Sequence, residues 1–244
     1  MSPLRRGPAR LIVAVAVAVA LAVAGALALA RRDSRPAAPS GERPVLTLVT
    51  TLPLIFADTF SLEGGGSKAL ATLETQYRVA PIGTTDAASL KQGKVLLMAH
   101  PLAQPAEALV DLDAWVRGGG RVLLLADPRL DWDSDRPLGD KLRPPPAFAD
   151  TGLLAHWGLK LEGPYPDGPA QVSLGGHQIM AASPGTLSGA CAVADRGFVA
   201  RCRIGKGRAT VVADADFLNV EELDGPTNEN LDALLDELAR LEAD

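Results

Sequence analysis

The chain of 244 residues is 47% hydrophobic and 22% charged, and it contains 24 Gly and 19 Pro. That length allows one sizeable core, and the Gly and Pro content predicts many turns and long loops. The first thirty residues hold three Arg and no acidic residue, so the remainder carries 21 basic and 29 acidic side chains. An acidic domain repels phosphate backbones, which argues against nucleic-acid binding.

An apolar segment dominates the amino-terminal region. Leu11 to Ala30 is an uninterrupted run of Ala, Val, Leu, Ile and one Gly. As a helix, this run would match the hydrocarbon thickness of a bilayer. We therefore predict a transmembrane signal-anchor at 11–30 that follows a cytoplasmic N-terminus at 1–10. Two alternatives are a signal peptide cleaved after Ala30 and a buried core helix, which rarely lacks every polar residue.

A polar segment rich in Pro and Ser follows at 31–44 and is typical of a linker. From residue 45 the chain alternates between apolar β-rich runs and amphipathic helical patterns. In chain order the predicted elements are a strand at 45–50, a helix at 67–76, strands at 77–82 and 94–99, a helix at 105–117 and a strand at 121–126. This alternation predicts an α/β fold with a mostly parallel sheet and helices on both faces.

The carboxyl-terminal half of the predicted domain, 45–244, is more mixed. A long loop is expected at 127–148. A short helix at 151–157 and a short strand at 159–161 come next. Turn signals at 175–176, 195–197 and 205–207 predict a β-hairpin region over 171–212, in which 209–213 is a buried strand. An amphipathic helix at 228–241 closes the domain.

Two cysteines occur in this hairpin region. A turn at Arg196-Gly197 would place Cys191 directly opposite Cys202, within reach of a disulfide. An even cysteine count in an exported chain favours such a bond, whereas a reducing compartment would leave two buried thiols. The disulfide prediction therefore places the domain on the extracytoplasmic side of the membrane.

Four polar residues follow predicted strands and are candidate ligand-binding residues: His100, Asp127, Asp214 and Asp216. In open α/β sheets, ligand crevices form at the carboxyl edge of the strands. The alternative is that these residues only end strands in ordinary turns. Because no nucleophile elbow, catalytic triad or metal-ligand cluster accompanies them, we predict no catalytic residue, no metal and no cofactor.

Three further patterns are weaker. Asp131, Asp133 and Asp135 have the spacing that opens a calcium loop, but Arg136 and Leu142 replace its Gly and Glu, so a solvated acidic loop is expected. The turn at 64–66 does not follow the order of a P-loop and is expected to be a flexible turn with Ser67 as helix N-cap. His156 and His177 stand alone and are expected to be loop or surface residues.

The order of motifs over 94–128 resembles extracytoplasmic domains of a family of gliding-motility-type, uncharacterised ABC transport systems. The shared features are a strand ending at Ala99-His100-Pro101, a helix with Leu112 to Val116, the turn 119–121 and a strand ending at Asp127-Pro128. Downstream, 153–159, 205–219 and Asn230 resemble the same family.

This resemblance implies a fold similar to class I glutamine amidotransferases without their catalytic Cys. It also implies a membrane-tethered protein that works with ABC transporter subunits. We therefore expect a non-enzymatic, single-pass inner-membrane protein, anchored by Leu11 to Ala30, whose C-terminal domain faces the periplasm. The alternative is a hydrolase or glycan-binding module that uses the carboxyl edge of the sheet.

Overall fold

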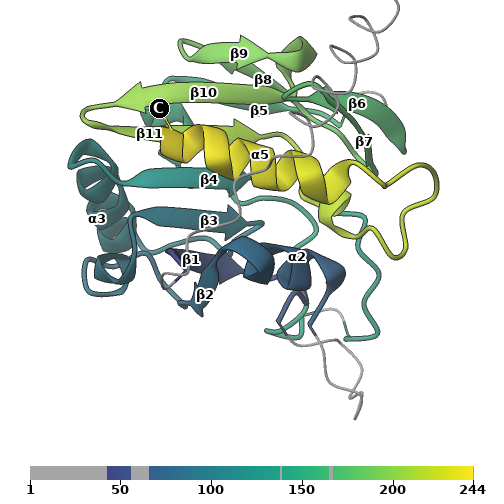
Figure 1. The fold of residues 1–244 in the computed structure, drawn as a ribbon, viewed down its shortest axis with the longest axis horizontal. Helices are drawn as coiled ribbons and strands as arrows, with labels where there is room; N and C mark the ends of the chain where they lie inside the picture. The colour runs from purple at the N-terminus through teal and green to yellow at the C-terminus, as the bar shows by residue number, and fades with distance from the viewer. Residues whose placement is uncertain (1–42, 56–65, 138, 165–166, 244) are drawn as a thin grey trace, which may run out of the picture. The chain divides into compact units, whose positions relative to one another are not determined.

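The computed structural model describes residues 43–55, 66–137, 139–164 and 167–243 (Figure 1). The predicted transmembrane segment 11–30, most of the linker 31–44 and most of the turn 64–66 lie outside the described residues. Among the residues that are described, no helix has the length and apolar character needed to cross a membrane. The membrane segment therefore stays a prediction from the sequence.

A seven-stranded sheet forms the centre of the domain, in the order β2-β1-β3-β4-β11-β10-β9. The strands are β1 (Val45–Thr50), β2 (Arg78–Pro81), β3 (Val95–Ala99), β4 (Arg121–Leu125), β9 (Ala192–Ala194), β10 (Val199–Ile204) and β11 (Gly207–Val212). Neighbours from β2 to β11 pair in parallel, and β10 pairs antiparallel with both β11 and β9. The mostly parallel α/β sheet is thus confirmed.

Helices cover both faces because the inner strands are apolar on both sides. All five residues of β3 are buried. Helix α2 (Lys68–Gln76) joins β1 to β2, whereas α3 (Ala106–Arg117) joins β3 to β4 in the opposite direction along the sheet. Right-handed crossovers place two such helices on opposite faces. Helix α5 (Asn230–Ala243) packs on β4 and β11 on the side of α2 (Figure 1).

The remaining strands form two small sheets. Strands β6 (Ala170–Leu174) and β7 (His177–Ala181) make the hairpin predicted around Gly175-Gly176, and both glycines have positive φ. Strand β5 (Leu159–Glu162), which follows the short helix α4 (Leu153–His156), pairs antiparallel with β8 (Thr186–Gly189). Short 3₁₀ turns are η1 (Ser89–Gln92), η2 (Asp195–Gly197) and η3 (Asp216–Leu218). As predicted, the Ser67 hydroxyl caps α2 by accepting from the Leu70 N–H at 3.1 Å.

A disulfide joins Cys191 to Cys202, with a Cα–Cα distance of 4.8 Å. Ala192 pairs with Arg201 in the β9–β10 ladder, so the predicted register is confirmed. The connection is longer than the predicted two-residue turn, because η2 and Phe198 lie between Ala194 and Val199. The predicted and the observed connection are both centred between Arg196 and Gly197. Cys191 therefore faces Cys202 whichever connection joins the two strands.

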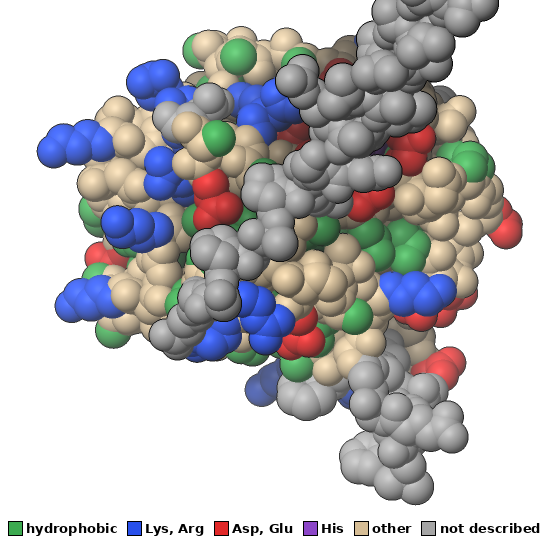
Figure 2. Space-filling view, in the orientation of Figure 1, with side chains coloured by type: hydrophobic (Ala, Val, Ile, Leu, Met, Phe, Trp, Pro, Cys, Tyr) green, Lys and Arg blue, Asp and Glu red, His purple; other side chains and the backbone are tan. Residues whose placement is uncertain are grey.

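Charged side chains are unevenly distributed over the domain. Figure 2 shows Lys and Arg gathered on the left, where the β10–β11 turn and the end of α5 lie, and most Asp and Glu on the right. The left side is the amino edge of the parallel strands, and the right side is their carboxyl edge. The domain has a net negative charge, but its basic side chains gather at the amino edge of the sheet and most of its acidic side chains lie towards the carboxyl edge.

We predict that the double variant Cys191→Ala/Cys202→Ala loses about 3 kcal/mol of unfolding free energy, because the bond closes a short loop in the unfolded chain. Urea denaturation of the two proteins would measure the difference. Wild-type protein treated with reductant is the matched control and should lose a similar amount. Equal stability of oxidised wild type and variant would contradict the disulfide.

Candidate functional site

Three acidic side chains meet at the carboxyl edge of two neighbouring strands. Asp127 follows β4, and Asp214 and Asp216 follow β11. Leu125 and Val212 pair at the carboxyl ends of these strands. One carboxylate oxygen from each Asp lies within 4.8 Å of the other two. All three side chains are buried. We call these residues the carboxyl cluster.

The carboxyl cluster holds the surrounding loops through their backbone amides. Asp127 accepts hydrogen bonds from the Arg129 N–H at 2.9 Å and the Ala215 N–H at 2.8 Å. Asp214 accepts from the Phe217 N–H at 2.8 Å. The Asp216 carboxyl accepts from the Asp131 N–H at 3.0 Å. These side chains therefore fix the two segments that leave β4 and β11.

Ser183, between β7 and β8, completes this network and was not among the predicted site residues. Its hydroxyl oxygen lies 3.1 Å from Asp127 Oδ1 and 2.9 Å from Asp216 Oδ2. Its backbone N–H donates to Asp214 at 3.3 Å. A Ser-Pro turn between β7 and β8 carries no local pattern that points to such a role, so only the tertiary structure reveals it.

His100 ends β3 beside the cluster but faces a different partner. Its Nε2 lies 2.8 Å from the Pro145 carbonyl oxygen, and its Nδ1 has no hydrogen-bond partner among the described residues. Burial lowers the pKa of His100, with a smaller opposing effect from the Asp127 charge. A neutral imidazole that donates from Nε2 to the carbonyl fits this geometry. His100 therefore fastens the loop 127–148 over the sheet edge.

Burial dominates the electrostatics of the carboxyl cluster. Burial raises the pKa of Asp216 to about 8, and the neighbouring Asp127 charge adds to the rise. Burial, followed by the charges of Asp127 and Asp216, holds the pKa of Asp214 well above its usual range. The described part of the chain provides no Lys or Arg ion pair to these carboxyls. Protons therefore take the place of a counter-ion in the cluster at neutral pH.

Oxygen ligands at this spacing suit a hard divalent cation such as Mg²⁺ or Ca²⁺. Metal binding requires deprotonated ligands, so such a cation would have to displace the protons held by Asp214 and Asp216. In the described residues no His or Cys joins the three carboxyl groups. The cluster could therefore hold an oxygen-ligated cation but not a zinc site of the common N/S type.

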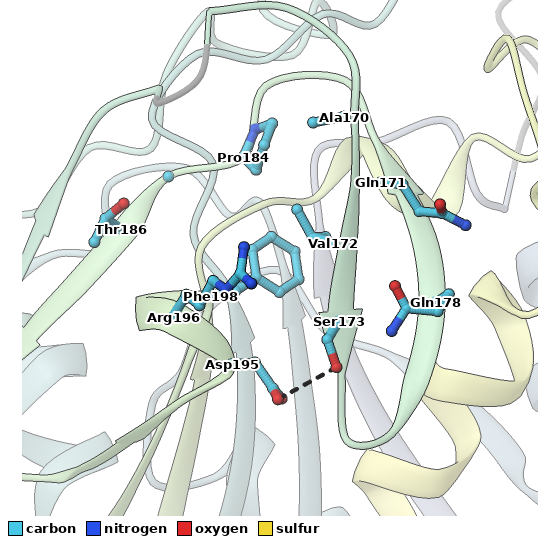
Figure 3. A pocket seen from close by; sticks show the side chains of 11 residues that line it. Ala170, Gln171, Val172, Ser173, Gln178, Pro184, Thr186, Asp195, Arg196 and Phe198 are labelled. Carbon is cyan, nitrogen blue, oxygen red and sulfur yellow. Dashed lines mark hydrogen bonds between the residues drawn. The ribbon is translucent and has the colours of Figure 1, made fainter.

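An open pocket lies elsewhere, between the β6–β7 hairpin, the start of β8 and η2 (Figure 3). Its volume is about 650 Å³, which is within the range of small-molecule sites. The lining combines two side-chain amides, a hydroxyl, a carboxylate, a guanidinium and an aromatic ring, contributed by Gln171, Gln178, Ser173, Asp195, Arg196 and Phe198. We call it the hairpin pocket.

Left-handed backbone shapes one wall of the hairpin pocket. Asp195 has a φ of 50° and Arg196 a φ of 57°. The Asp195 carboxylate accepts from the Gly175 N–H at 2.9 Å and from the Ser173 hydroxyl at 3.4 Å, which offsets its strain. Arg196 is exposed and hydrogen-bonds to no described side chain, although this conformation costs a residue with a β-carbon roughly 1–2 kcal/mol. The fold therefore holds an unpaired guanidinium at the pocket.

The acidic residues of the loop 127–148 are exposed as expected, whereas His156 ends helix α4 and His177 begins strand β7, so neither lies alone in a loop. Asp131, Asp133 and Asp135 are exposed on the loop 127–148. His156 is exposed, with Nε2 3.3 Å from an Asp113 oxygen. His177 is half-buried and forms a bridge between β7 and α5, with Nε2 2.8 Å from Asp236 Oδ2. None of these residues lines the hairpin pocket.

The chain was compared with protein families, with curated protein sequences and with solved structures. No protein-family model matches the chain, and no curated protein sequence matches it. Among solved structures, an exo-β-1,4-mannosidase from Opitutaceae bacterium strain TAV5 is 11% identical with a TM-score of 0.49, over 81% of this chain and 36% of that chain. This chain therefore spans about a third of the length of that mannosidase.

Two shorter proteins are similar over nearly their whole length. A cytoplasmic protein from Salmonella typhimurium LT2 is 12% identical with a TM-score of 0.48, over 81% of this chain and 99% of that chain. A ThuA-like protein from Bacteroides uniformis ATCC 8492 is 12% identical with a TM-score of 0.43, over 85% of this chain and 95% of that chain. Because these TM-scores lie below 0.5, we derive no function from them.

The raised pKa values predict how stability depends on pH. Asp214 and Asp216 bind protons more tightly in the folded protein than in the unfolded chain. Their stabilising effect is therefore complete below the ordinary pKa of 3.8 and is lost as the pH rises towards about 8, the folded pKa of Asp216. Each extra bound proton contributes a slope of about 1.4 kcal/mol per pH unit in this window.

Asp216→Asn mimics the protonated carboxyl and should flatten this slope, so the variant gains stability over wild type above pH 7. Chemical denaturation from pH 4 to pH 9 would measure the effect. Asp133→Asn, at an exposed position of the loop 127–148, is the matched control and should follow wild type. A variant with the wild-type slope would show that Asp216 is already ionised in the folded protein.

Proposed function

We propose that the chain is a non-enzymatic, membrane-tethered extracytoplasmic domain that binds a polar ligand in the hairpin pocket. In this proposal it serves an ABC-type transport or cell-envelope system as an auxiliary or partner-binding component. The observation that carries the proposal is the contrast between two places in the fold. The carboxyl cluster is buried and its oxygens hold loop amides, whereas the hairpin pocket is open and presents an unpaired Arg196.

The chemistry of the hairpin pocket supports a small ligand with hydroxyl or carboxylate groups. The amides of Gln171 and Gln178 supply donors and acceptors, and the Arg196 guanidinium supplies a charged fork that suits carboxylates. Phe198 is almost fully buried and supplies an apolar base. A few polar groups around an apolar surface are typical of small-molecule sites. The described lining of the pocket contains neither Cys nor His, and its one carboxylate, Asp195, accepts hydrogen bonds from Gly175 and Ser173.

The proposed fold is similar to that of class I glutamine amidotransferases, as the sequence resemblance implies. One backbone feature supports it. His100 has a φ of 45° directly after β3, a strained strand end like the one that presents the nucleophile in elbow motifs. Here the residue at that turn is a histidine and not a nucleophilic Ser or Cys, and its imidazole hydrogen-bonds to the Pro145 carbonyl oxygen. This difference supports a fold used for binding rather than for catalysis.

The proposed location depends on the disulfide and on the segment 11–30. A disulfide is stable in an oxidising compartment, which supports an extracytoplasmic domain. The apolar run at 11–30 would supply the tether. The association with ABC transporter subunits depends on the family resemblance alone.

A hydrolase that uses the carboxyl cluster is a second candidate. A pKa of about 8 makes Asp216 a proton donor at neutral pH, as general-acid catalysis requires. Catalysis would need the loop 127–148 to open, because it covers His100 and the cluster. Hydrolysis of a chromogenic glycoside by wild type but not by Asp216→Asn would replace the binding proposal with this one.

The hairpin pocket is tested by thermal unfolding with a panel of soluble sugars, sugar acids and amino acids. A ligand present at 100 times its Kd stabilises the protein by about 2.7 kcal/mol. We expect at least one compound to raise the Tm of wild type, and Arg196→Ala to abolish most of the shift. Arg203→Ala, an exposed arginine on β10, is the matched control. A panel without any stabilising compound, or an undiminished shift in Arg196→Ala, would contradict the proposal.

The tether is tested by fractionation. We expect the full chain to stay in the membrane pellet after a carbonate wash and to co-purify with ABC transporter subunits. Val19→Arg/Leu21→Arg should prevent membrane retention, because each Arg at the centre of a spanning helix costs about 2.5–3.5 kcal/mol. Val19→Leu/Leu21→Val is the conservative control. Release of the wild-type chain by carbonate would refute the tether, and a pellet without transporter subunits would refute the partner.

A further inference from the structure

Strand β6 has a free edge on the side away from β7. It pairs only with β7, in a two-stranded antiparallel sheet. In an antiparallel pair, residues that bond to the partner strand alternate with residues that direct their N–H and C=O groups away from it. The two-residue turn makes Leu174, which pairs with His177, a bonding residue. Gln171 and Ser173 therefore direct their backbone groups to the outer edge.

Contacts of β7 support this alternation. Its outward residues, Gln178 and Met180, are bonded to α5. The Gln178 N–H donates to Glu229 at 2.8 Å, and the Met180 N–H donates to Asn230 at 3.0 Å. One edge of the hairpin is thus occupied by the helix. At the opposite edge, the backbone groups that β6 directs outward form no hydrogen bond within the part of the chain that the structure describes.

The free edge of β6 borders the hairpin pocket. Consecutive residues 170–173 of β6 line the pocket. Figure 3 shows Asp195 at the lower end of the pocket, Pro184 at the upper end, and Arg196 and Phe198 between them. At the lower end the Asp195 carboxylate accepts from the Gly175 N–H at 2.9 Å. A backbone N–H of this hairpin therefore already binds a carboxylate next to the free edge.

The pocket offers a peptide more than hydrogen bonds to its backbone. Arg196 is exposed, and its planar guanidinium suits a carboxylate. Phe198 supplies a buried apolar surface for side chains on one face of an added strand. Four extended residues span roughly 13 Å, which matches the length of the segment 170–173. The chemistry and the length of the site therefore fit a short extended peptide.

We propose that the hairpin pocket binds a short extended peptide that carries a carboxylate, and that this peptide adds as a strand to the free edge of β6. Its backbone exchanges hydrogen bonds with Gln171 and Ser173, and its carboxylate binds Arg196. Strand addition takes affinity from main-chain hydrogen bonds and selectivity from side-chain contacts. The inference rests on the hairpin pocket of the proposed function and names its ligand class.

Three pools of N-acetylated tetrapeptides test the ligand class. The first has free C-termini and no acidic side chain, the second has C-terminal amides and one Glu, and the third has amides and no acid. Each pool is passed over the immobilised full chain, and retained peptides are identified by mass spectrometry. We expect retention from the first pool or the second, which identifies the carboxylate. The third should bind at least roughly tenfold more weakly, because it lacks a charged hydrogen bond.

The best retained peptide tests strand addition. At 100 times its Kd, it should slow hydrogen exchange at the Gln171 and Ser173 amides about a hundredfold, because only free protein leaves them open. Two analogues carry N-methyl groups at alternate residues, in opposite phase. An added strand presents only one phase to β6. We therefore expect one analogue to bind at least roughly tenfold more weakly than the other, because a buried acceptor on β6 loses its donor.

Variants of the protein test the same contacts. Gln171→Pro and Gln171→Ala both remove the side-chain amide, but only Pro also removes the outward N–H, which does not bond to β7. We expect the Pro variant to bind the peptide roughly fivefold more weakly than the Ala variant. Arg196→Ala should weaken the peptide at least roughly tenfold and should have little effect on its uncharged analogue. Circular dichroism would verify folding, and the N-methyl analogues need no variant.

Two results would overturn the peptide proposal and leave the proposed function standing. In the first, a sugar, sugar acid or amino acid raises the Tm through Arg196, but no peptide is retained. In the second, peptides are retained, but both N-methyl phases bind equally or Arg196→Ala binds the charged peptide as well as wild type does. If neither the peptide pools nor the small molecules bind, the hairpin pocket is not a ligand site, and both proposals fail.

Discussion

The structure depends on how three carboxyl groups are accommodated in the protein interior without a basic partner among the described residues. Parallel strands β4 and β11 end side by side, so Asp127, Asp214 and Asp216 meet where solvent cannot reach them. Retained protons and donated backbone amides replace the counter-ions that such a group usually needs. The same hydrogen bonds join the loop after β4, the turn at Ser183 and the segment before α5. Three of the residues predicted to line a ligand crevice therefore also hold the loops at this edge of the sheet.

Much of the fold could be predicted because its determinants are local. The strand β3 is apolar on both faces, which requires helices on both sides, and the meeting of Cys191 with Cys202 follows from a symmetrical hairpin register. The convergence of the three Asp residues follows from parallel neighbours. By contrast, the pairing of β5 with β8 and the role of Ser183 depend on contacts between distant segments. The bond from His100 to Pro145 and the left-handed Arg196 also lack a signal in the adjacent sequence.

In the described domain, the polar groups that stabilise the fold and the polar groups that solvent can reach lie in different places. Carboxyls at the centre of the sheet hold loops, whereas guanidinium and amide groups around the β6–β7 hairpin meet solvent. The basic residues at the amino edge form a third group, next to the point where the chain enters the domain.

The disulfide between Cys191 and Cys202 links the oxidation state of the protein to the shape of the hairpin pocket. It closes the hairpin that carries Asp195 and Arg196, two residues of the pocket wall, while the parallel strands and the carboxyl cluster lie outside that loop. A newly made chain in a reducing cytoplasm would thus possess its core before it possesses a fixed recognition surface. In the extracytoplasmic location that we propose, oxidation of the two thiols would fix this wall of the pocket.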